Sequence, residues 1–204
     1  MGIQIVKEGQ PCDYLAAPAV VCTVKFLRAL ARGPTVISST FVDQTLDKGT
    51  LLDVEDFILK DKEAVKRHNM VLETSVARTK ANRGKLLVGV PIYCTEKTRN
   101  DPDNYKAIAE ANSAIFNIYR ARNGTTIRPT TAEEGGNAPP EPVYLLSSTR
   151  PDEKPLWEKF CDMAYKANME PRIVPPDWLL DVAMAQQVRF DKKCLAEKFY
   201  ENAQ

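Results

Sequence analysis

The chain has 204 residues, of which 44% are hydrophobic and 27% are charged, as in ordinary globular proteins with one large or two small domains. Because 28 Lys and Arg residues almost balance 27 Asp and Glu residues, the net charge of +1 gives no electrostatic case for non-specific binding to DNA or to an anionic membrane. No apolar run reaches the roughly 18 residues of a transmembrane helix. The first residues also lack the layout of a signal peptide, so we expect neither a membrane protein nor a secreted one.

The chain contains five cysteines and a single histidine, His68. The cysteines are odd in number, and no two of them have the Cys-x-x-Cys spacing of a zinc site. We therefore expect reduced thiols in a cytosolic or nuclear protein with no metal site and no cofactor. The cysteines are Cys12, Cys22, Cys94, Cys161 and Cys194.

The first half of the chain predicts strands alternating with helices. Ile3–Val6 and Tyr14–Ala16 are strand-like apolar runs, and apolar residues between Val24 and Ala31 recur at helical spacing. Thr35–Ser38 is typical of a buried strand, and Phe41–Lys48 of a brief helix closed by a glycine.

The start of the first predicted helix, Cys22-Thr23-Val24-Lys25, has the chemistry of an anion site. The Thr23 hydroxyl and the Lys25 ammonium can meet one phosphate together with the unpaired backbone N–H groups of a helix N-terminus. The simpler interpretation is that Thr23 only caps its helix and that Lys25 is solvated. From the residues alone, both interpretations stay open.

From about Leu59 to Lys80 the sequence predicts one long amphipathic helix. Its apolar stripe faces one way and its charged residues face outward, so we interpret residues 59–83 as a linker helix that braces the two halves. His68 lies on the stripe, and no carboxylate, serine or cysteine indicates that it acts as a base. We expect a packed structural histidine. The stripe consists of Ala64, Val65, His68, Val71, Leu72 and Val76.

The second half, from residue 84 onward, also alternates strands with helices, which predicts an α/β fold with a parallel sheet covered by helices. Residues 120–142 are rich in turn-forming residues and predict a hairpin insertion. The expected strands are Leu86–Tyr93, Ala114–Tyr119, Val143–Ser147 and Arg172–Val174. The expected helices are Asp103–Ser113, the segment after Pro155, and Asp177–Gln187.

These patterns resemble the BRCT repeat. The second half resembles a whole repeat, with an apolar strand before Ser147 and a Pro-Asp-Trp signature at Trp178 that opens the last helix. The first half resembles the later part of another repeat, with Thr-x-Lys at Thr23 and Lys25 and an aromatic residue at Phe41.

The resemblance implies two BRCT-like repeats, each a parallel four-stranded sheet flanked by helices. The first repeat, residues 1–58, lacks its opening strand and first helix, and the linker helix 59–83 joins it to the second repeat, residues 84–204. In the family's sheet the opening strand is central, so its absence would leave Ile3–Val6 without a neighbour. Three explanations are open: the chain is a fragment, a strand-supplying or swapped second chain completes the sheet, or residues 1–11 are disordered or repack.

Tandem modules of this kind bind phosphoserine or phosphothreonine peptides in DNA-damage-response scaffolds, and the resemblance is greatest to fungal multi-BRCT proteins that read phosphorylated histone tails. It implies a nuclear, chromatin-associated protein whose partner is a phosphorylated protein or peptide such as a histone tail. Direct nucleic-acid binding and membrane binding are not expected. The alternative is a structural interaction module that binds proteins independently of phosphate.

The sequence contains none of the common catalytic motifs. No P-loop, G-x-S-x-G, His-Glu-x-x-His or G-x-G-x-x-G pattern occurs, and no acidic pair can be placed in one cleft. We therefore expect no catalytic residue and no enzymatic activity.

The resemblance assigns phosphate binding to Thr23 and Lys25, which match one pair of the family's phosphate ligands. The other pair, a Ser/Thr and a Gly N–H at the end of the opening strand, has no counterpart in this sequence. The loss of these contacts should weaken phosphate binding, because each charge-assisted hydrogen bond contributes roughly 1.5–3 kcal/mol.

A peptide specificity pocket is expected beside the phosphate site. Cys22 and Phe26 would form its near side, although Cys22 stands where binding-competent members often carry an arginine and brings no positive charge. Lys97, Arg99 and Asn100, in a loop of the second half, would form the far side and favour an acidic or C-terminal residue.

Overall fold

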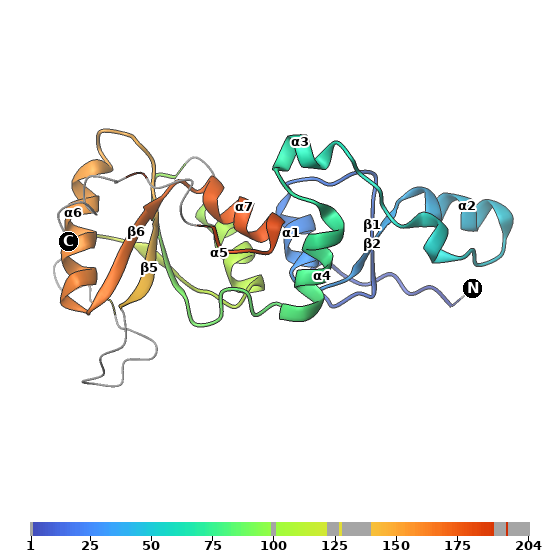
Figure 1. Cartoon of the computed structure of the whole chain (residues 1–204), viewed down its shortest axis with the longest axis horizontal. Helices are drawn as coiled ribbons and strands as arrows, with labels where there is room; N and C mark the ends of the chain where they lie inside the picture. The colour runs from blue at the N-terminus through green and yellow to red at the C-terminus, as the bar shows by residue number, and fades with distance from the viewer. Residues whose placement is uncertain (1, 99–100, 122–126, 128–139, 190–194, 196–204) are drawn as a thin grey trace. The chain divides into compact units, whose positions relative to one another are not determined.

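The computed structural model describes residues 2–98, 101–121, 127, 140–189 and 195 (Figure 1). The chain divides into two compact units: Met1–Leu86 with Leu180–Val188, and Leu87–Leu179 with Arg189–Gln204. Each unit has its own parallel sheet, which confirms the predicted α/β class. Across the described ranges, no helix has both the length and the apolar character needed to cross a bilayer.

The first unit is built on a two-stranded parallel sheet. β1 (Tyr14–Ala17) pairs with β2 (Thr35–Ser38), and α1 (Val24–Leu30) connects them, because parallel neighbours need a crossover between their ends. α2 (Thr40–Lys48) follows β2 and ends at Gly49, whose φ of 65° is the left-handed conformation that glycine adopts without strain. These elements agree with the predicted ones.

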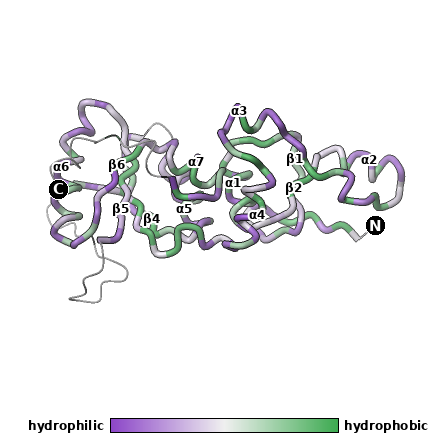
Figure 2. Tube along the Cα trace, in the orientation of Figure 1, coloured by the Kyte–Doolittle hydropathy of each residue, from purple (hydrophilic) through white to green (hydrophobic). Residues whose placement is uncertain are grey.

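The predicted strand at Ile3–Val6 is wrong. These residues form no regular structure, and the side chain of Ile5 is 92% exposed. The sheet ends at β1, so the segment has no strand to pair with, and an isolated apolar run cannot satisfy its backbone groups as a strand. Figure 2 shows this stretch near the N-terminus as largely hydrophobic.

The single linker helix is corrected to two shorter helices, α3 (Ala64–His68) and α4 (Leu72–Asn82), which follow the 3₁₀ turn η1 (Val54–Phe57). The helix cannot begin at Leu59, because Leu59 is held against β2 by a hydrogen bond from its N–H to the carbonyl of Val36. Asn69 then ends α3 in the left-handed conformation, with φ of 48°, a role that asparagine tolerates.

The break between α3 and α4 changes which side chains are buried. Ala64 and Leu72 lie in the core as predicted. Val65 and Val71, which a continuous helix would place on the same stripe, are 46% and 48% exposed. His68 is partly buried at the end of α3.

Asp61 fixes the loop that leads into α1. Its carboxylate accepts hydrogen bonds from the Val20 N–H at 2.9 Å and the Ala64 N–H at 3.1 Å, and it also pairs with Arg67. The hydrogen bond from Val20, aided by Arg67, holds the pKa of the Asp61 carboxyl below its ordinary value. This carboxylate therefore joins the segment before Cys22 to the start of α3.

The second unit contains a four-stranded parallel sheet in the order β4-β3-β5-β6. Its first strand, β3, lies between β4 and β5, which is the central place that the resemblance implies for an opening strand. α5 connects β3 to β4, α6 connects β5 to β6, and α7 follows β6 (Figure 1). The bounds are β3 (Pro91–Thr95), β4 (Ile115–Tyr119), β5 (Glu141–Leu146), β6 (Met169–Val174), α5 (Pro102–Ala111), α6 (Lys154–Lys166) and α7 (Asp177–Ala185).

The elements of the second half lie close to the predicted ones, with two differences. The first strand begins at Pro91, because Leu86–Gly89 forms a turn in which Gly89 has a φ of 74°. The predicted hairpin at 120–142 lies almost wholly outside the described residues.

Both faces of the second sheet are packed with aromatic rings. On one face Tyr93, Tyr119 and Phe160 meet edge to face, with ring centroids 5.4–6.3 Å apart. On the other face Trp178 stacks on Tyr144 at 4.2 Å, so the prediction of Trp178 as a core residue is confirmed by its 1% exposure. These layers fix α6 and the first residues of α7 against the strands.

Replacing Gly33 with alanine is expected to destabilise the first unit more than replacing Gly49. Both glycines have positive φ, so either alanine incurs about 1–2 kcal/mol of left-handed strain. A Cβ at Gly33 would also come within 3.2–3.3 Å of the α4 backbone at Thr79 and Lys80, whereas a Cβ at Gly49 meets no atom within 4 Å. Calorimetric unfolding of the two variants checks this difference, and equal losses would contradict the close approach of residue 33 to α4.

Candidate functional site

Thr23 is the N-cap of α1. Its backbone is extended, and its hydroxyl oxygen accepts a hydrogen bond from the Phe26 N–H at 3.3 Å. The capping role is therefore present in the structure. It does not exclude ligand binding, because a hydroxyl that accepts one hydrogen bond can still donate its own proton.

Cys22, Thr23 and Lys25 all have exposed side chains at this helix start. Lys25 borders a groove of about 770 Å³ that is lined by residues 2–16, α1, β2 and α2. No carboxylate of the described residues forms an ion pair with the Lys25 ammonium. The threonine hydroxyl and the lysine charge are thus both accessible to a ligand.

The other residues of the predicted specificity pocket have different surroundings. Phe26 is 3% exposed and packs in the core of the first unit, so we leave it out of the proposed pocket. Lys97 belongs to the second unit, where its ammonium lies 3.1 Å from the Asp152 carboxylate. Arg99 and Asn100 lie outside the described residues.

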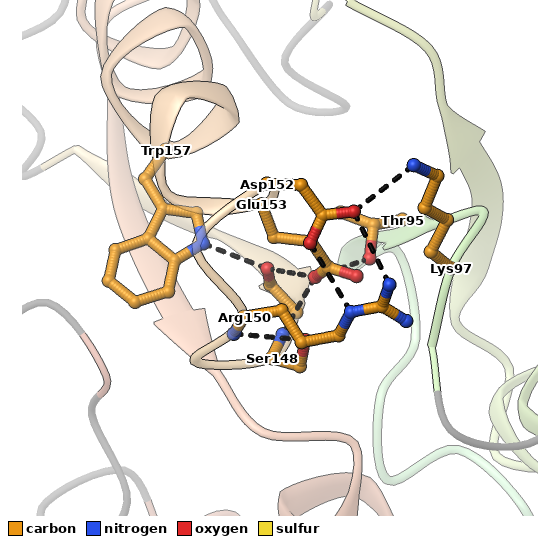
Figure 3. A network of polar contacts seen from close by, with 8 residues as sticks. Thr95, Lys97, Ser148, Arg150, Asp152, Glu153 and Trp157 are labelled. Atoms are coloured by element: carbon orange, nitrogen blue, oxygen red, sulfur yellow. Dashed lines mark hydrogen bonds and ion pairs between the residues drawn. The ribbon is translucent and has the colours of Figure 1, made fainter.

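In the second unit, a buried carboxylate occupies the helix start that corresponds to Thr23. Glu153 is the N-cap residue of α6 and is 1% exposed. Its Oε2 accepts hydrogen bonds from the Thr95 hydroxyl at 2.9 Å, the Ser147 hydroxyl at 2.6 Å and the Ser148 N–H at 2.8 Å (Figure 3). The indole N–H of Trp157 donates to the Ser147 hydroxyl at 2.8 Å and extends the network into the core.

The topology of the sheet explains why these groups meet. Thr95 ends β3 and Ser147 follows β5, and the carboxyl ends of neighbouring parallel strands lie at the same edge of a sheet. α6 begins at that edge with Glu153. The corresponding helix of the first unit, α1, likewise follows a parallel strand and begins after Thr23.

An exposed layer of charges surrounds this network. Asp152 pairs with Lys97 and also with Arg150, whose Nε lies 3.2 Å from the carboxylate (Figure 3). The hydrogen bond from Lys97 is the main cause that lowers the pKa of Asp152. Elsewhere in the described part of the chain, no three His, Cys, Asp or Glu side chains gather as they would around a metal ion.

Comparisons with known proteins agree with this architecture. The family model for the BRCT domain of regulator of Ty1 transposition protein 107 matches residues 1–59. A crystal structure of the S. pombe Brc1 BRCT5-BRCT6 domains matches with a TM-score of 0.71 and 23% identity, over 97% of this chain and 88% of that chain. The fold is that of a tandem BRCT module.

Two curated proteins and a solved complex are also similar to this chain. BRCT-containing protein 1 of Schizosaccharomyces pombe is 25% identical over 98% of this chain, which spans 22% of that protein. Mediator of DNA damage checkpoint protein 1 of Homo sapiens is 28% identical over 50% of this chain, which corresponds to 5% of that protein. The complex of Rtt107p with a phosphorylated histone matches with a TM-score of 0.64 and 17% identity, over 94% of this chain and 78% of that chain.

The sequence analysis missed Glu153 in the second unit. This residue stands between Asp152 and Lys154, in a charged stretch that is typical of a solvated surface. A signal was nevertheless present, because Thr95 and Ser147 are polar residues at the ends of two apolar strands. Such residues converge at one edge of a parallel sheet and need a shared hydrogen-bond partner when they are buried.

Replacing Ser147 with alanine is expected to lower the free energy of unfolding of the second repeat by about 1.5–3 kcal/mol. The change removes a donor to the Glu153 carboxylate and the acceptor of the Trp157 indole, and it leaves both groups buried. Ser148→Ala is the matched control, because the donor of Ser148 is its backbone N–H, which alanine retains.

Urea unfolding followed by tryptophan fluorescence measures this difference, since both tryptophans of the chain lie in the second repeat. The control should stay within about 0.5 kcal/mol of the natural protein. Equal stability of the two variants would show that Ser147 does not support the buried carboxylate.

Proposed function

We propose that this module binds phosphoserine or phosphothreonine in a protein partner, with the Thr23 hydroxyl and the Lys25 ammonium holding the phosphate. The observation that carries the proposal is the exposed Thr-x-Lys at the start of α1, in a fold whose structural relatives include a complex with a phosphorylated histone. The natural ligand is then a phosphorylated nuclear protein, such as a histone tail, and the module acts as part of a DNA-damage-response scaffold and not as an enzyme.

Electrostatics favours a phosphate over a neutral side chain at this site. A phosphoserine carries about 1.5 to 2 negative charges and three acceptor oxygens. The net charge of the chain is only +1, so attraction must come from local groups. Lys25 and the Thr23 hydroxyl provide a positive charge and a donor within one turn of helix, and the exposed Cys22 lies beside them without adding charge.

We propose, as the resemblance implies, that Lys97, Arg99 and Asn100 of the second repeat also contribute to peptide specificity. Lys97 already pairs with Asp152, so its charge is partly neutralised. This pairing favours polar contacts to the peptide over strong selection for an acidic residue.

Lys25→Met is expected to remove the preference for a phosphorylated ligand. Methionine keeps the aliphatic stem and loses the charge, and the loss of one charge-assisted hydrogen bond of roughly 1.5–3 kcal/mol corresponds to about a tenfold to hundredfold weaker affinity. Calorimetric titration with a serine-phosphorylated histone-tail peptide and its unphosphorylated twin measures both affinities.

Lys48→Met, which removes another exposed lysine of the first repeat, is the matched control and should leave both affinities unchanged. The phosphate assignment is wrong if the natural protein binds the two peptides equally well, or if Lys25→Met behaves like the control.

A second candidate function, phosphate-independent protein binding, is favoured by the free edge of β1. In the second repeat β5 has a neighbour on each side, β3 and β6, whereas β1 pairs only with β2 among the described strands. The groove beside β1 is lined in part by apolar side chains of the first repeat. We propose that a second copy of this chain supplies a strand to this edge. The apolar lining includes Ile3, Ile5, Val6, Phe41, Val42 and Leu51.

The pairing of β1 shows which backbone groups face the free edge. The carbonyl of Asp13 accepts a hydrogen bond from the N–H of Thr35, the first residue of β2, and the carbonyl of Ala17 accepts one from the N–H of Ser39, just after β2. The backbone groups of residues 13 and 17 therefore face β2. Backbone groups alternate sides along a strand in a parallel sheet. The N–H and C=O groups of Ala16 therefore point toward the free edge and are available to an added strand.

Ala16→Pro is expected to block this association without disturbing the fold, since proline is tolerated where its missing N–H faces an open edge. Ala17→Pro is the matched control, because it removes an N–H that faces β2 and should destabilise the first repeat by at least about 1 kcal/mol. Sedimentation over a range of concentrations and thermal unfolding measure the two effects. A natural chain that stays monomeric, or an Ala16→Pro variant that self-associates equally, would refute the strand exchange.

A further inference from the structure

The second repeat contains hydrogen-bond donors that converge on one point, as in a site for an anion. Two hydroxyls and one backbone N–H, from Thr95, Ser147 and Ser148, donate to the same oxygen, Oε2 of Glu153. The other oxygen, Oε1, is buried and has no hydrogen-bond partner among the residues that the structure describes. Buried carboxylates normally have partners on both oxygens, so this side chain matches the donor set only in part.

The position of this donor set in the repeat is also informative. Glu153 is the N-cap residue of the helix after β5, and Thr23 is the N-cap residue of the helix after β1. In the first repeat this position is exposed and carries a hydroxyl. In the second repeat it is buried and carries a carboxylate that points back to the ends of β3 and β5 (Figure 3).

We propose that the second repeat holds a preformed anion site that its own Glu153 occupies. The donor set takes a carboxylate in the natural protein and takes an inorganic phosphate when the carboxylate is removed. The inference rests on the proposed function in one respect: it treats the start of α6 as the counterpart of the phosphate site at the start of α1. It implies that the natural module binds one phosphate per chain, in the first repeat alone.

Two features explain why an external anion does not displace Glu153. The side chain is attached to the site, so its effective concentration exceeds that of a free ligand. A second anion beside a buried carboxylate would also be repelled. Outside the site, Lys97 and Arg150 share the single carboxylate of Asp152, so the surrounding charges favour the entry of an anion once Glu153 is gone.

The test uses the full chain with Glu153→Ala and measures thermal unfolding by tryptophan fluorescence. At constant ionic strength, chloride is exchanged stepwise for inorganic phosphate. Glu153→Ala should have a lowered melting temperature that rises with phosphate concentration, because a ligand that binds only the folded state stabilises it. Both tryptophans lie in the second repeat and report its unfolding, so the natural protein should show no such rise there, because Glu153 fills the site and phosphate binds only in the first repeat.

Three variants make the result specific. Glu153→Gln keeps the site filled by a side chain of the same shape and should not respond to phosphate. Thr95→Val combined with Glu153→Ala removes a donor and should lose the response. Lys25→Met combined with Glu153→Ala should keep it, which separates this inference from the phosphate site of the first repeat.

The possible outcomes all bear on the proposal. If Glu153→Ala folds only when phosphate is present, the proposal is supported. If phosphate raises the melting temperature of the natural protein and the variant equally, the effect is non-specific and the proposal fails. If Glu153→Ala does not respond, or does not fold even in phosphate, the donors do not form a phosphate site.

Discussion

A carboxylate can be buried only where hydrogen-bond donors meet it, and the second repeat meets this demand at one oxygen of Glu153, Oε2. The cost of burying an unpaired charge is large, so the strand ends that carry Thr95 and Ser147 must stay close to the start of α6. The same oxygen also accepts a hydrogen bond from the Ser148 N–H. The Trp157 indole donates to Ser147 from the core side. One side chain thus fixes two central strands and a helix at the edge where parallel sheets place their functional groups.

The two repeats use this edge in different ways. In the first repeat the helix start carries an exposed hydroxyl with a lysine two residues further along, and no carboxylate among the described residues forms an ion pair with that lysine. In the second repeat, the buried Glu153 side chain of the chain itself occupies the equivalent position. A common scaffold therefore carries an exposed threonine and lysine at one helix start and a buried carboxylate at the other, which illustrates that function depends on the residues placed on a fold and not on the fold itself.

Local sequence patterns predicted the elements whose structure is decided locally. α2 ends at Gly49 as its turn chemistry predicts, and Trp178 lies in the core because its apolar neighbours recur at helical spacing. The prediction of a strand at Ile3–Val6 was wrong because a strand needs a neighbouring strand to pair with, and a local sequence pattern does not show whether one is present. The prediction of one continuous linker helix was wrong because Leu59 pairs with β2 and Asn69 adopts a left-handed conformation. Amphipathic spacing reveals neither feature. The phosphate-binding role of Thr23 and Lys25 rests on adjacent residues and a family resemblance and stays a prediction, whereas the role of Glu153 depends on contacts between segments 58 residues apart in the chain.

The described cysteines differ in burial, and one of them offers an accessible thiol for labelling. Of the four cysteines in the described part of the chain, Cys94 and Cys161 are buried, and burial raises the pKa of the Cys94 thiol to about 11. Cys12 is half-buried, and burial together with Asp13 raises its pKa. Cys22 is exposed immediately beside Thr23. Thiol-reactive dyes attack the accessible thiolate first, so among these four described cysteines a maleimide fluorophore will attach first to Cys22 and report on its surroundings next to the exposed helix start.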